Sequence, residues 1–97
     1  MWILRSSAPA QPLKFRLASG SVKTVGRAPR ADFIVDAPLV SRLHCRLSAA
    51  AARVEVEDLS STNGTYVNDR RVKRAQLTSG DRLRVGRVEL IVEKAGD

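Results

Sequence analysis

Short stretches of alternating apolar and polar residues recur along this chain. The clearest is residues 53–57, where Val54 and Val56 are separated by charged side chains, as expected for a strand with one buried face. Between residues 83 and 92 the apolar positions change from odd to even numbers at Gly86-Arg87. This change of phase predicts a tight hairpin turn with glycine at its first central position.

Further strands and a second hairpin follow from weaker patterns. Asn68-Asp69 lies within residues 67–70 and predicts a hairpin there, because Asn and Asp tolerate a positive φ. Residues 49–52 are all alanine, a run too short for a stable helix, and we read it as a loop or a strand end. The remaining predicted strands are Trp2–Arg5, Leu13–Leu17, Val22–Val25, Phe33–Val35 and Leu43–Ser48. Many short strands without a helical stripe predict a β-sandwich or a barrel.

Length and composition fit one small domain with an aliphatic core. The chain has 97 residues, near the usual size of a single domain. Eleven Val, ten Leu and three Ile stand against only 4% aromatic residues. Valine in this proportion favours strands, because branching at Cβ suits a pleated surface.

The net charge of +7 points to an anionic partner. Thirteen of the 17 basic residues are arginine, whose planar guanidinium grips phosphate or carboxylate with two parallel hydrogen bonds. Nucleic acid, a phosphorylated or acidic peptide and a lipid headgroup are all compatible with this charge. A solvated surface enriched in arginine is the simpler interpretation for most of these residues.

A single cysteine, Cys45, excludes an internal disulfide and any zinc site built from several cysteines. We expect it to be a small buried residue in a strand, since free cysteine is usually packed away. The N-terminal apolar run breaks at Arg5, so no signal peptide or membrane span is predicted. The expected location is cytosolic, and residues 94–97 resemble the start of a linker in a longer protein.

Polar residues concentrate in three loops that are longer than hairpins require. These loops are residues 26–32, 36–42 and 59–64, and in a sandwich such loops gather at one end, where binding residues usually lie. They offer a guanidinium, several hydroxyls and a carboxamide, which are groups suited to phosphate oxygens.

The motifs in these loops resemble the forkhead-associated (FHA) domain, a phosphothreonine-recognition module. Four pieces match in order: Gly26-Arg27, Ser41 to His44, Ser61 to Thr65, and Gly80-Asp81 before a final hairpin. Together they cover residues 22–92 of a predicted single domain spanning residues 1–97. The resemblance implies an all-β sandwich of two twisted sheets with about eleven strands, with the phosphopeptide on the loops at one end.

The resemblance also implies a role for each binding residue. Arg27 would pair with the phosphate, and Ser41 would hydrogen-bond a phosphate oxygen, assisted by the backbone N–H of Arg42. Thr62 would line the edge of the phosphate pocket. Asn63 would hold the peptide backbone beside the phosphothreonine.

Other positions are implied to shape the site. Gly26 would let the loop turn so that Arg27 points at the ligand, and Gly64 would supply a tight turn. His44 would brace the loops by hydrogen bonding without touching the ligand. Arg42 stands where the family often has Asn and could add a second cation, and Leu39 suggests an apolar preference for the third residue after the phosphothreonine.

These features predict a non-enzymatic module that binds phosphothreonine on partner proteins downstream of a Ser/Thr kinase. Ser41 and His44 could suggest a nucleophile and a base, but no acid is clearly placed to orient His44 and no oxyanion-hole motif follows. No metal site, cofactor or membrane partner is indicated. The alternative is a basic β-domain that binds nucleic acid, which the shortage of aromatic residues for base stacking disfavours.

Overall fold

A computed structural model describes residues 1–7 and 12–96, and across these ranges it contains eleven strands in two sheets. The six-stranded sheet consists, in spatial order, of β2 (Lys14–Leu17), β1 (Trp2–Ser6), β11 (Val88–Lys94), β10 (Arg82–Val85), β7 (Thr65–Val67) and β8 (Arg70–Val72). The five-stranded sheet consists of β4 (Phe33–Ile34), β3 (Val22–Gly26), β5 (Cys45–Ala49), β6 (Val54–Asp58) and β9 (Arg74–Leu77).

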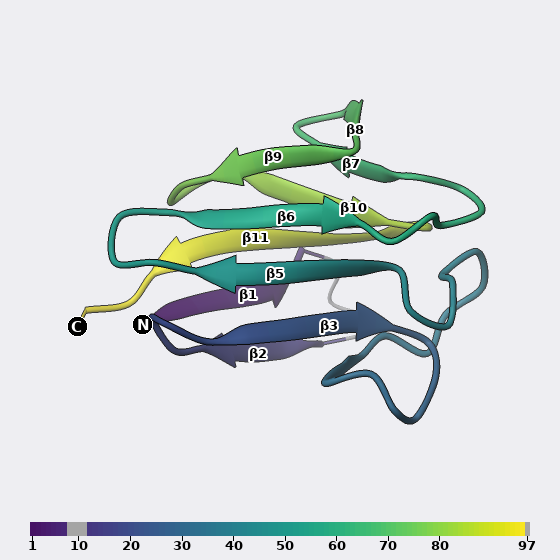
Figure 1. Ribbon diagram of the computed structural model, residues 1–97, viewed down its shortest axis with the longest axis horizontal. Coiled ribbons are helices and arrows are strands. Elements are labelled where there is room, and N and C mark those ends of the chain that lie inside the picture. Colours follow the sequence, from purple (N-terminus) through teal and green to yellow (C-terminus); the bar gives the residue numbers. More distant parts are fainter. Residues whose placement is uncertain (8–11, 97) are drawn as a thin grey trace.

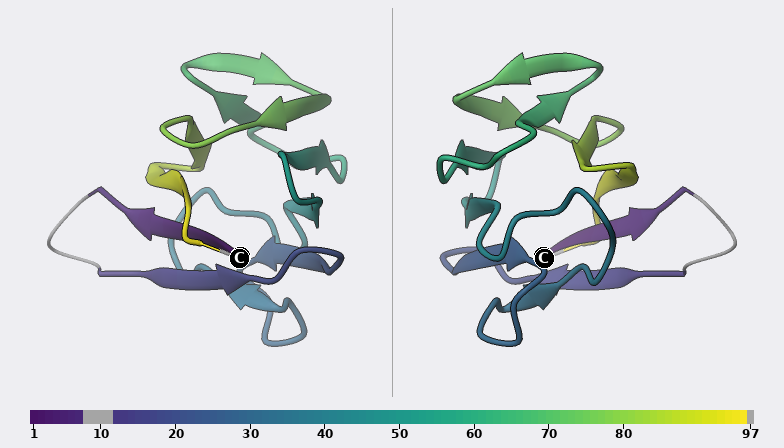
Figure 2. Two further views of the ribbon diagram at one scale, coloured as in Figure 1. Left: turned by 90° about the vertical axis from the view of Figure 1, so that its left-hand side faces the viewer. Right: turned by 90° about the vertical axis from the view of Figure 1, so that its right-hand side faces the viewer.

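The two sheets lie face to face, as the end-on views in Figure 2 show. Neighbouring strands are antiparallel, except for the short parallel pairing of β3 with β4. This arrangement confirms the predicted all-β sandwich. The described part of the chain contains no helix long and apolar enough to cross a membrane.

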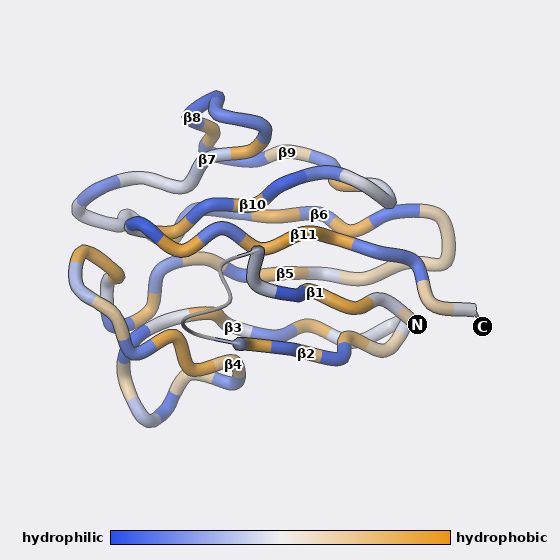
Figure 3. The backbone as a smooth tube through the Cα atoms, turned by 180° about the vertical axis from the view of Figure 1, so that it is seen from behind, coloured by the Kyte–Doolittle hydropathy of each residue, from blue (hydrophilic) through white to orange (hydrophobic). Residues whose placement is uncertain are grey.

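The core fills the space between the sheets with aliphatic side chains. Val54 and Val56 of β6 are fully buried, and so are Leu83 and Leu90 of the facing sheet. Along β10 hydrophobic and hydrophilic positions alternate (Figure 3), as its half-buried position requires, whereas β11 has three consecutive apolar residues at its centre. The largest buried side chain is Trp2, whose indole N–H donates to the carbonyl of Ala50 at 2.8 Å.

Both predicted hairpins are confirmed. Asn68 and Asp69 join β7 to β8 with φ angles of 50° and 68°, which both central residues of such a two-residue turn need. Gly86 has φ of 58° at the first central position between β10 and β11. Ala49 ends β5, so the alanine run is a strand end followed by a loop.

Several strand limits differ from the prediction, and one strand was missed. β5 begins at Cys45, two residues later than expected, because Leu43 and His44 belong to the preceding loop. β9 was not predicted, since its sequence Arg-Ala-Gln-Leu has only one strongly apolar residue, Leu77. Lys94 still belongs to β11, whereas residue 97 of the expected linker lies outside the described residues.

The chain ends and the three polar loops lie at opposite ends of the sandwich (Figure 1). The amide of Ala95 donates to the carbonyl of Met1 at 2.9 Å, and the N-terminal ammonium contacts the carbonyl of Gly96 at 3.2 Å. The connections that follow β3, β4 and β6 gather at the other end. We call this region, formed by residues 27–32, 36–44 and 59–64, the loop end.

Candidate functional site

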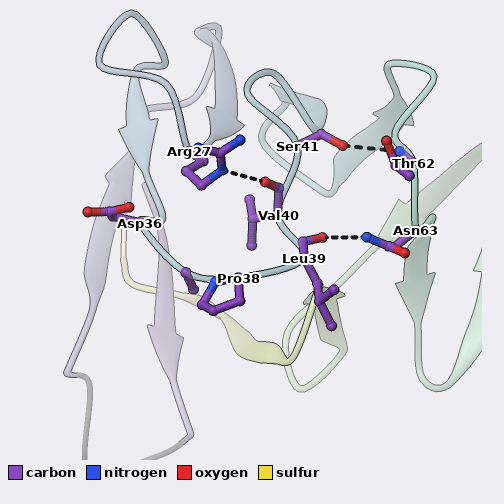
Figure 4. Close-up of a pocket in the computed structure, with 9 residues that line it drawn as sticks. Arg27, Asp36, Pro38, Leu39, Val40, Ser41, Thr62 and Asn63 are labelled. Atoms are coloured by element: carbon purple, nitrogen blue, oxygen red, sulfur yellow. Dashed lines mark hydrogen bonds between the residues drawn. The ribbon is translucent and has the colours of Figure 1, made fainter.

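The loop end encloses an open pocket of about 570 Å³. Its walls come from three loops that are far apart in the sequence (Figure 4). The residues that line it are Arg27, Asp36, Ala37, Pro38, Leu39, Val40, Ser41, Thr62 and Asn63. Five of the predicted site residues are therefore brought together, namely Arg27, Leu39, Ser41, Thr62 and Asn63.

Arg27 is fixed against the loop that carries Ser41. Its backbone amide donates to the carbonyl of Ser41 at 2.9 Å, and its Nε donates to the carbonyl of Val40 at 3.0 Å. Gly26 permits this approach, since a Cβ there would lie 2.0 Å from the carbonyl oxygen of Arg42. The glycine is thus required by close backbone packing in a strand and not by a left-handed turn.

Two hydrogen bonds cross the pocket and join its walls. The backbone amide of Thr62 donates to the hydroxyl oxygen of Ser41 at 3.1 Å. The side-chain amide of Asn63 donates to the carbonyl of Leu39, also at 3.1 Å. These bonds, drawn in Figure 4, hold residues 39–41 and 62–63 at a set separation.

His44 is fully buried and contacts both of these loops. The backbone amide of Ser41 donates to its Nδ1 at 3.1 Å, so the ring hydrogen belongs on Nε2, which is 2.8 Å from the carbonyl oxygen of Gly64. One imidazole therefore joins two loops through contacts to Ser41 and Gly64, which are distant from each other in the sequence. Gly64, with φ of 91°, lets the second loop turn under the ring.

Asp58 holds the loop of residues 59–64 in place, a role that the sequence analysis did not predict. Its carboxylate accepts hydrogen bonds from the Ser61 hydroxyl at 2.5 Å, the Thr65 hydroxyl at 2.7 Å and the Ser61 amide at 3.2 Å. Burial alone would raise the pKa of Asp58, but these three bonds together hold that pKa below its ordinary value. The spacing Asp-x-x-Ser, typical of a side chain that closes a turn on the backbone, was the available signal.

Leu39 has an unusual backbone conformation for a branched apolar residue. Its φ is 71°, in the left-handed region, and its side chain is 46% exposed. Such strain persists only where the surroundings impose it, and it is common at binding sites. Here Asn63 holds the Leu39 carbonyl, and Gly86 of the β10–β11 hairpin packs so closely that a Cβ would lie 3.1 Å from the Leu39 carbonyl carbon.

Arg42 does not line this pocket. It lies in a neighbouring pocket of about 510 Å³, together with Arg27, Ala28, Pro29 and Arg30. The backbone amide of Ala28 donates to the carbonyl of Arg42 at 3.1 Å, which holds the two segments side by side. Arg27 belongs to both pockets.

Ser41 and His44 do not form a nucleophile–base pair. Ser41 contacts the His44 ring through its backbone amide, while its hydroxyl oxygen accepts from Thr62. Cys45 is buried in β5, as expected, and burial raises the pKa of its thiol to about 12, with a smaller contribution from Asp58. Among the described residues, no group of three or more His, Cys, Asp or Glu could hold a metal ion.

Comparison with known proteins identifies relatives over most of the chain. The FHA domain family model matches residues 23–86. Glycogen accumulation regulator GarA from Mycolicibacterium smegmatis is 37% identical over 68 residues, which make up 70% of this chain and 43% of that protein. The chain thus spans less than half of that relative.

Solved structures resemble this chain over nearly its full length. The FHA domain of CT664 protein from Chlamydia trachomatis superimposes with a TM-score of 0.91 at 26% identity, covering 98% of both chains. A second domain, solved in a structural and functional analysis of phosphothreonine-dependent FHA domain interactions, gives a TM-score of 0.88 at 31% identity. It covers 99% of this chain and 98% of that one.

Proposed function

Because this chain belongs to the FHA domain family, we propose that its loop end binds phosphothreonine peptides through the pocket that Arg27, Ser41, Thr62 and Asn63 line. The observation that carries the proposal is the meeting of these four side chains, from three separate loops, in one open pocket. A guanidinium, two hydroxyls and a carboxamide form a set of donors that suits a phosphate group and the peptide backbone beside it.

Several hydrogen-bonding groups in the pocket are not used within the protein and remain for a ligand. Arg27 uses Nε on the carbonyl of Val40, which leaves both terminal amino groups for a two-pronged contact with phosphate. The Ser41 hydroxyl accepts from Thr62 and keeps its own hydrogen to donate. Asn63 uses one amide hydrogen on Leu39, and its other amide hydrogen and its oxygen remain for a peptide strand.

The biological role follows from this chemistry and from the relatives. The ligand carries a phosphate on threonine, so the module acts downstream of a Ser/Thr kinase and joins proteins without a catalytic step. One of the similar structures comes from work on phosphothreonine-dependent FHA domain interactions, and another is a complex of an FHA domain with the intracellular domain of Rv3910. Both support a protein partner for this chain.

Nucleic-acid binding is the weaker candidate because each of the four aromatic side chains is buried or has at least one ring face covered, which leaves little surface for stacking bases. Trp2 is buried, and Phe15 stacks on Phe33 with ring centroids 4.7 Å apart. The guanidinium of Arg84 covers the ring of Tyr66 at 4.1 Å. The net charge alone supports only weak, salt-sensitive contacts with nucleic acid.

The decisive experiment is selection from an oriented phosphothreonine peptide library, with the unphosphorylated library as its control. We expect enrichment of phosphorylated sequences only, and calorimetry on one enriched peptide should give binding that disappears when its phosphate is removed. Equal recovery from both libraries would contradict the proposal. A duplex DNA of random sequence, titrated at low and at physiological salt, tests the alternative in the same preparation.

A further inference from the structure

The second pocket at the loop end is lined by three arginines. Arg27, Arg30 and Arg42 surround a space of about 510 Å³, and no Asp or Glu is among the residues that line it in the described part of the chain. Three guanidinium groups around one concave space create a strong positive potential. An anionic side chain that enters would be held by several charge-assisted hydrogen bonds.

Five arginines elsewhere in the described part of the chain meet a carboxylate or a ring. Arg5 pairs with Glu93, Arg46 and Arg74 pair with Glu57, Arg82 pairs with Asp69, and Arg84 lies over Tyr66. Within residues 1–7 and 12–96, neither Arg30 nor Arg42 has a side-chain hydrogen bond or ion pair. Their charges therefore remain available to a ligand.

The backbone around this pocket is held in place. The amide and the hydroxyl of Thr24 donate to the carboxylate of Asp32 at 2.9 and 3.1 Å, and the Asp32 amide donates back to the Thr24 hydroxyl. Inside the loop, the Ala31 amide donates to the carbonyl of Ala28 at 3.0 Å. The Asp32 carboxylate is thus directed at β3 and does not neutralise the arginines.

We propose that this three-arginine pocket binds a second anionic side chain of the same phosphopeptide, either a second phosphate or a carboxylate. The inference rests on the proposed function, since Arg27 serves both pockets and the phosphothreonine would fill the first one. An extended peptide advances about 3.3 Å per residue, so the second anion lies within a few residues of the phosphothreonine. The module then distinguishes peptides with two neighbouring anions from peptides with one.

The experiment uses one enriched phosphothreonine peptide whose flanking residues are neutral. In three series, Glu, Ala or phosphoserine is placed at each position from roughly four residues before to four residues after the phosphothreonine. Calorimetry at constant ionic strength measures the affinity of each peptide. We expect a gain of about threefold to tenfold over the alanine series at one or two adjacent positions, the size of one partly solvated charge-assisted contact.

The variant Arg30→Ala tests whether the pocket is responsible. We expect it to bind the singly phosphorylated neutral peptide like the wild type and to lose most of the gain from the second anion. Arg53→Ala is the matched control, because Arg53 is an exposed arginine in the β5–β6 connection, and this connection lies at the end of the sandwich that holds the chain ends (Figure 1). It removes the same unit of charge and should retain the full gain.

Each outcome has one meaning. A gain from phosphoserine alone assigns the pocket to a second phosphate, and an equal gain from Glu assigns it to anions in general. No gain at any position, or the same gain in Arg30→Ala as in Arg53→Ala, overturns the inference while the proposed function stands. Failure of the singly phosphorylated peptide to bind at all overturns the proposed function itself.

Discussion

Some arginines on the sheets are paired with carboxylates, whereas those at the loop end are not. On the five-stranded sheet the strand register places Arg46 and Arg74 on either side of Glu57, and both pair with it. At the loop end Arg27 contacts only a backbone carbonyl, while Arg30 and Arg42 have no ion pair within the described residues. Other sheet arginines, such as Arg16, Arg70 and Arg71, have no ion pair among the described residues either, but none of them lines the pockets at the loop end.

This difference shows that net charge alone says little about a binding site. Cross-strand pairing supplies a neighbour to each residue of a sheet, and an acidic neighbour neutralises an arginine at little gain in stability. Loops have no such register, and Arg30 and Arg42 at the loop end have no acidic neighbour among the residues that line their pocket. Removing an arginine from the loop end should therefore affect ligand binding, whereas removing one from a sheet should not.

The largest effect is expected from removing the phosphate contacts. Arg27→Ala and Ser41→Ala should each weaken phosphothreonine-peptide binding about 10- to 150-fold, because a hydrogen bond to a charged group contributes roughly 1.5–3 kcal/mol. Calorimetry measures the loss, and circular dichroism checks that the fold is retained. Arg5→Ala is the control on the sheet and should leave the affinity unchanged.

Wild-type affinity in a folded Arg27→Ala protein would remove that residue from the site. Equal weakening in Arg5→Ala would mean that binding depends on total charge, and the contrast between the two regions would disappear.

The next effect concerns stability at the loop end. His44→Ala should lower the free energy of unfolding by roughly 1–3 kcal/mol, because the Ser41 amide and the Gly64 carbonyl would lose a buried partner. Urea titration measures this change. Binding should also weaken as the two loops separate. A variant with unchanged stability and abolished binding would instead place His44 in contact with the ligand.

Much of the fold could be predicted from residues with strong local preferences. The alternation around Val54 and Val56 and the turns at Gly86 and Asn68-Asp69 are local, so the sequence pattern was sufficient. β9 was missed because its own residues have little preference for a strand, and it becomes one by pairing with β6.

For the candidate site, the motifs predicted which residues lie together, and their roles in binding stay predictions. Arg27, Ser41, Thr62 and Asn63 meet in one pocket, as the resemblance implied. The side chain of Arg42 lies in the adjacent pocket, and that position depends on how two loops are aligned by the Ala28 amide. The alignment of these two loops cannot be predicted from the pattern of residues along the chain.

A smaller effect separates phosphothreonine from phosphoserine. We expect the threonine γ-methyl to pack between the loops that carry Ser41 and Thr62. Burial of one methyl is worth about 0.8 kcal/mol, or roughly fourfold in affinity, and the lost contacts and freer χ1 of serine could take the ratio past about tenfold. Matched peptides measured by calorimetry decide this, and equal affinities would indicate a general anion site.

Acid unfolding should distinguish the carboxylates of the two regions. The pKa of Glu57 is lowered chiefly by its hydrogen bond to Arg46 and then by Arg74, whereas that of Asp58 is lowered by uncharged donors that outweigh burial. Both lowered pKa values add stability above the ordinary carboxyl range, near pH 4, and this stability is lost as the pH falls through the folded-state value.

Added salt screens an ion pair more than a bond to a hydroxyl. In urea titrations from neutral pH downward, high salt should therefore reduce the effect of Glu57→Gln and leave that of Asp58→Asn largely intact. The same salt response in both variants would contradict this assignment.

The smallest effect is expected on the sheet. Arg5→Ala should change the free energy of unfolding by less than about 1 kcal/mol, because the pair of Arg5 with Glu93 is exposed on both sides. Urea titration is again the measurement. A loss of stability as large as that of His44→Ala would contradict this expectation and show that the exposed pair of Arg5 with Glu93 stabilises the fold.

Met1 and Ala95 lie side by side, so any segment fused to the N-terminus or to the C-terminus starts from the same point on the surface. A flexible segment fused to either end starts on the side away from the pocket and must pass along a body whose longest dimension is 33 Å. At 3.3–3.6 Å per residue this takes at least about ten extended residues. A phosphothreonine on a shorter fused segment can reach only the pocket of a neighbouring molecule. On a longer segment it can reach the pocket of its own molecule, where it competes at a high effective concentration with ligands from solution. The length of the fused segment therefore decides between self-capture and assembly.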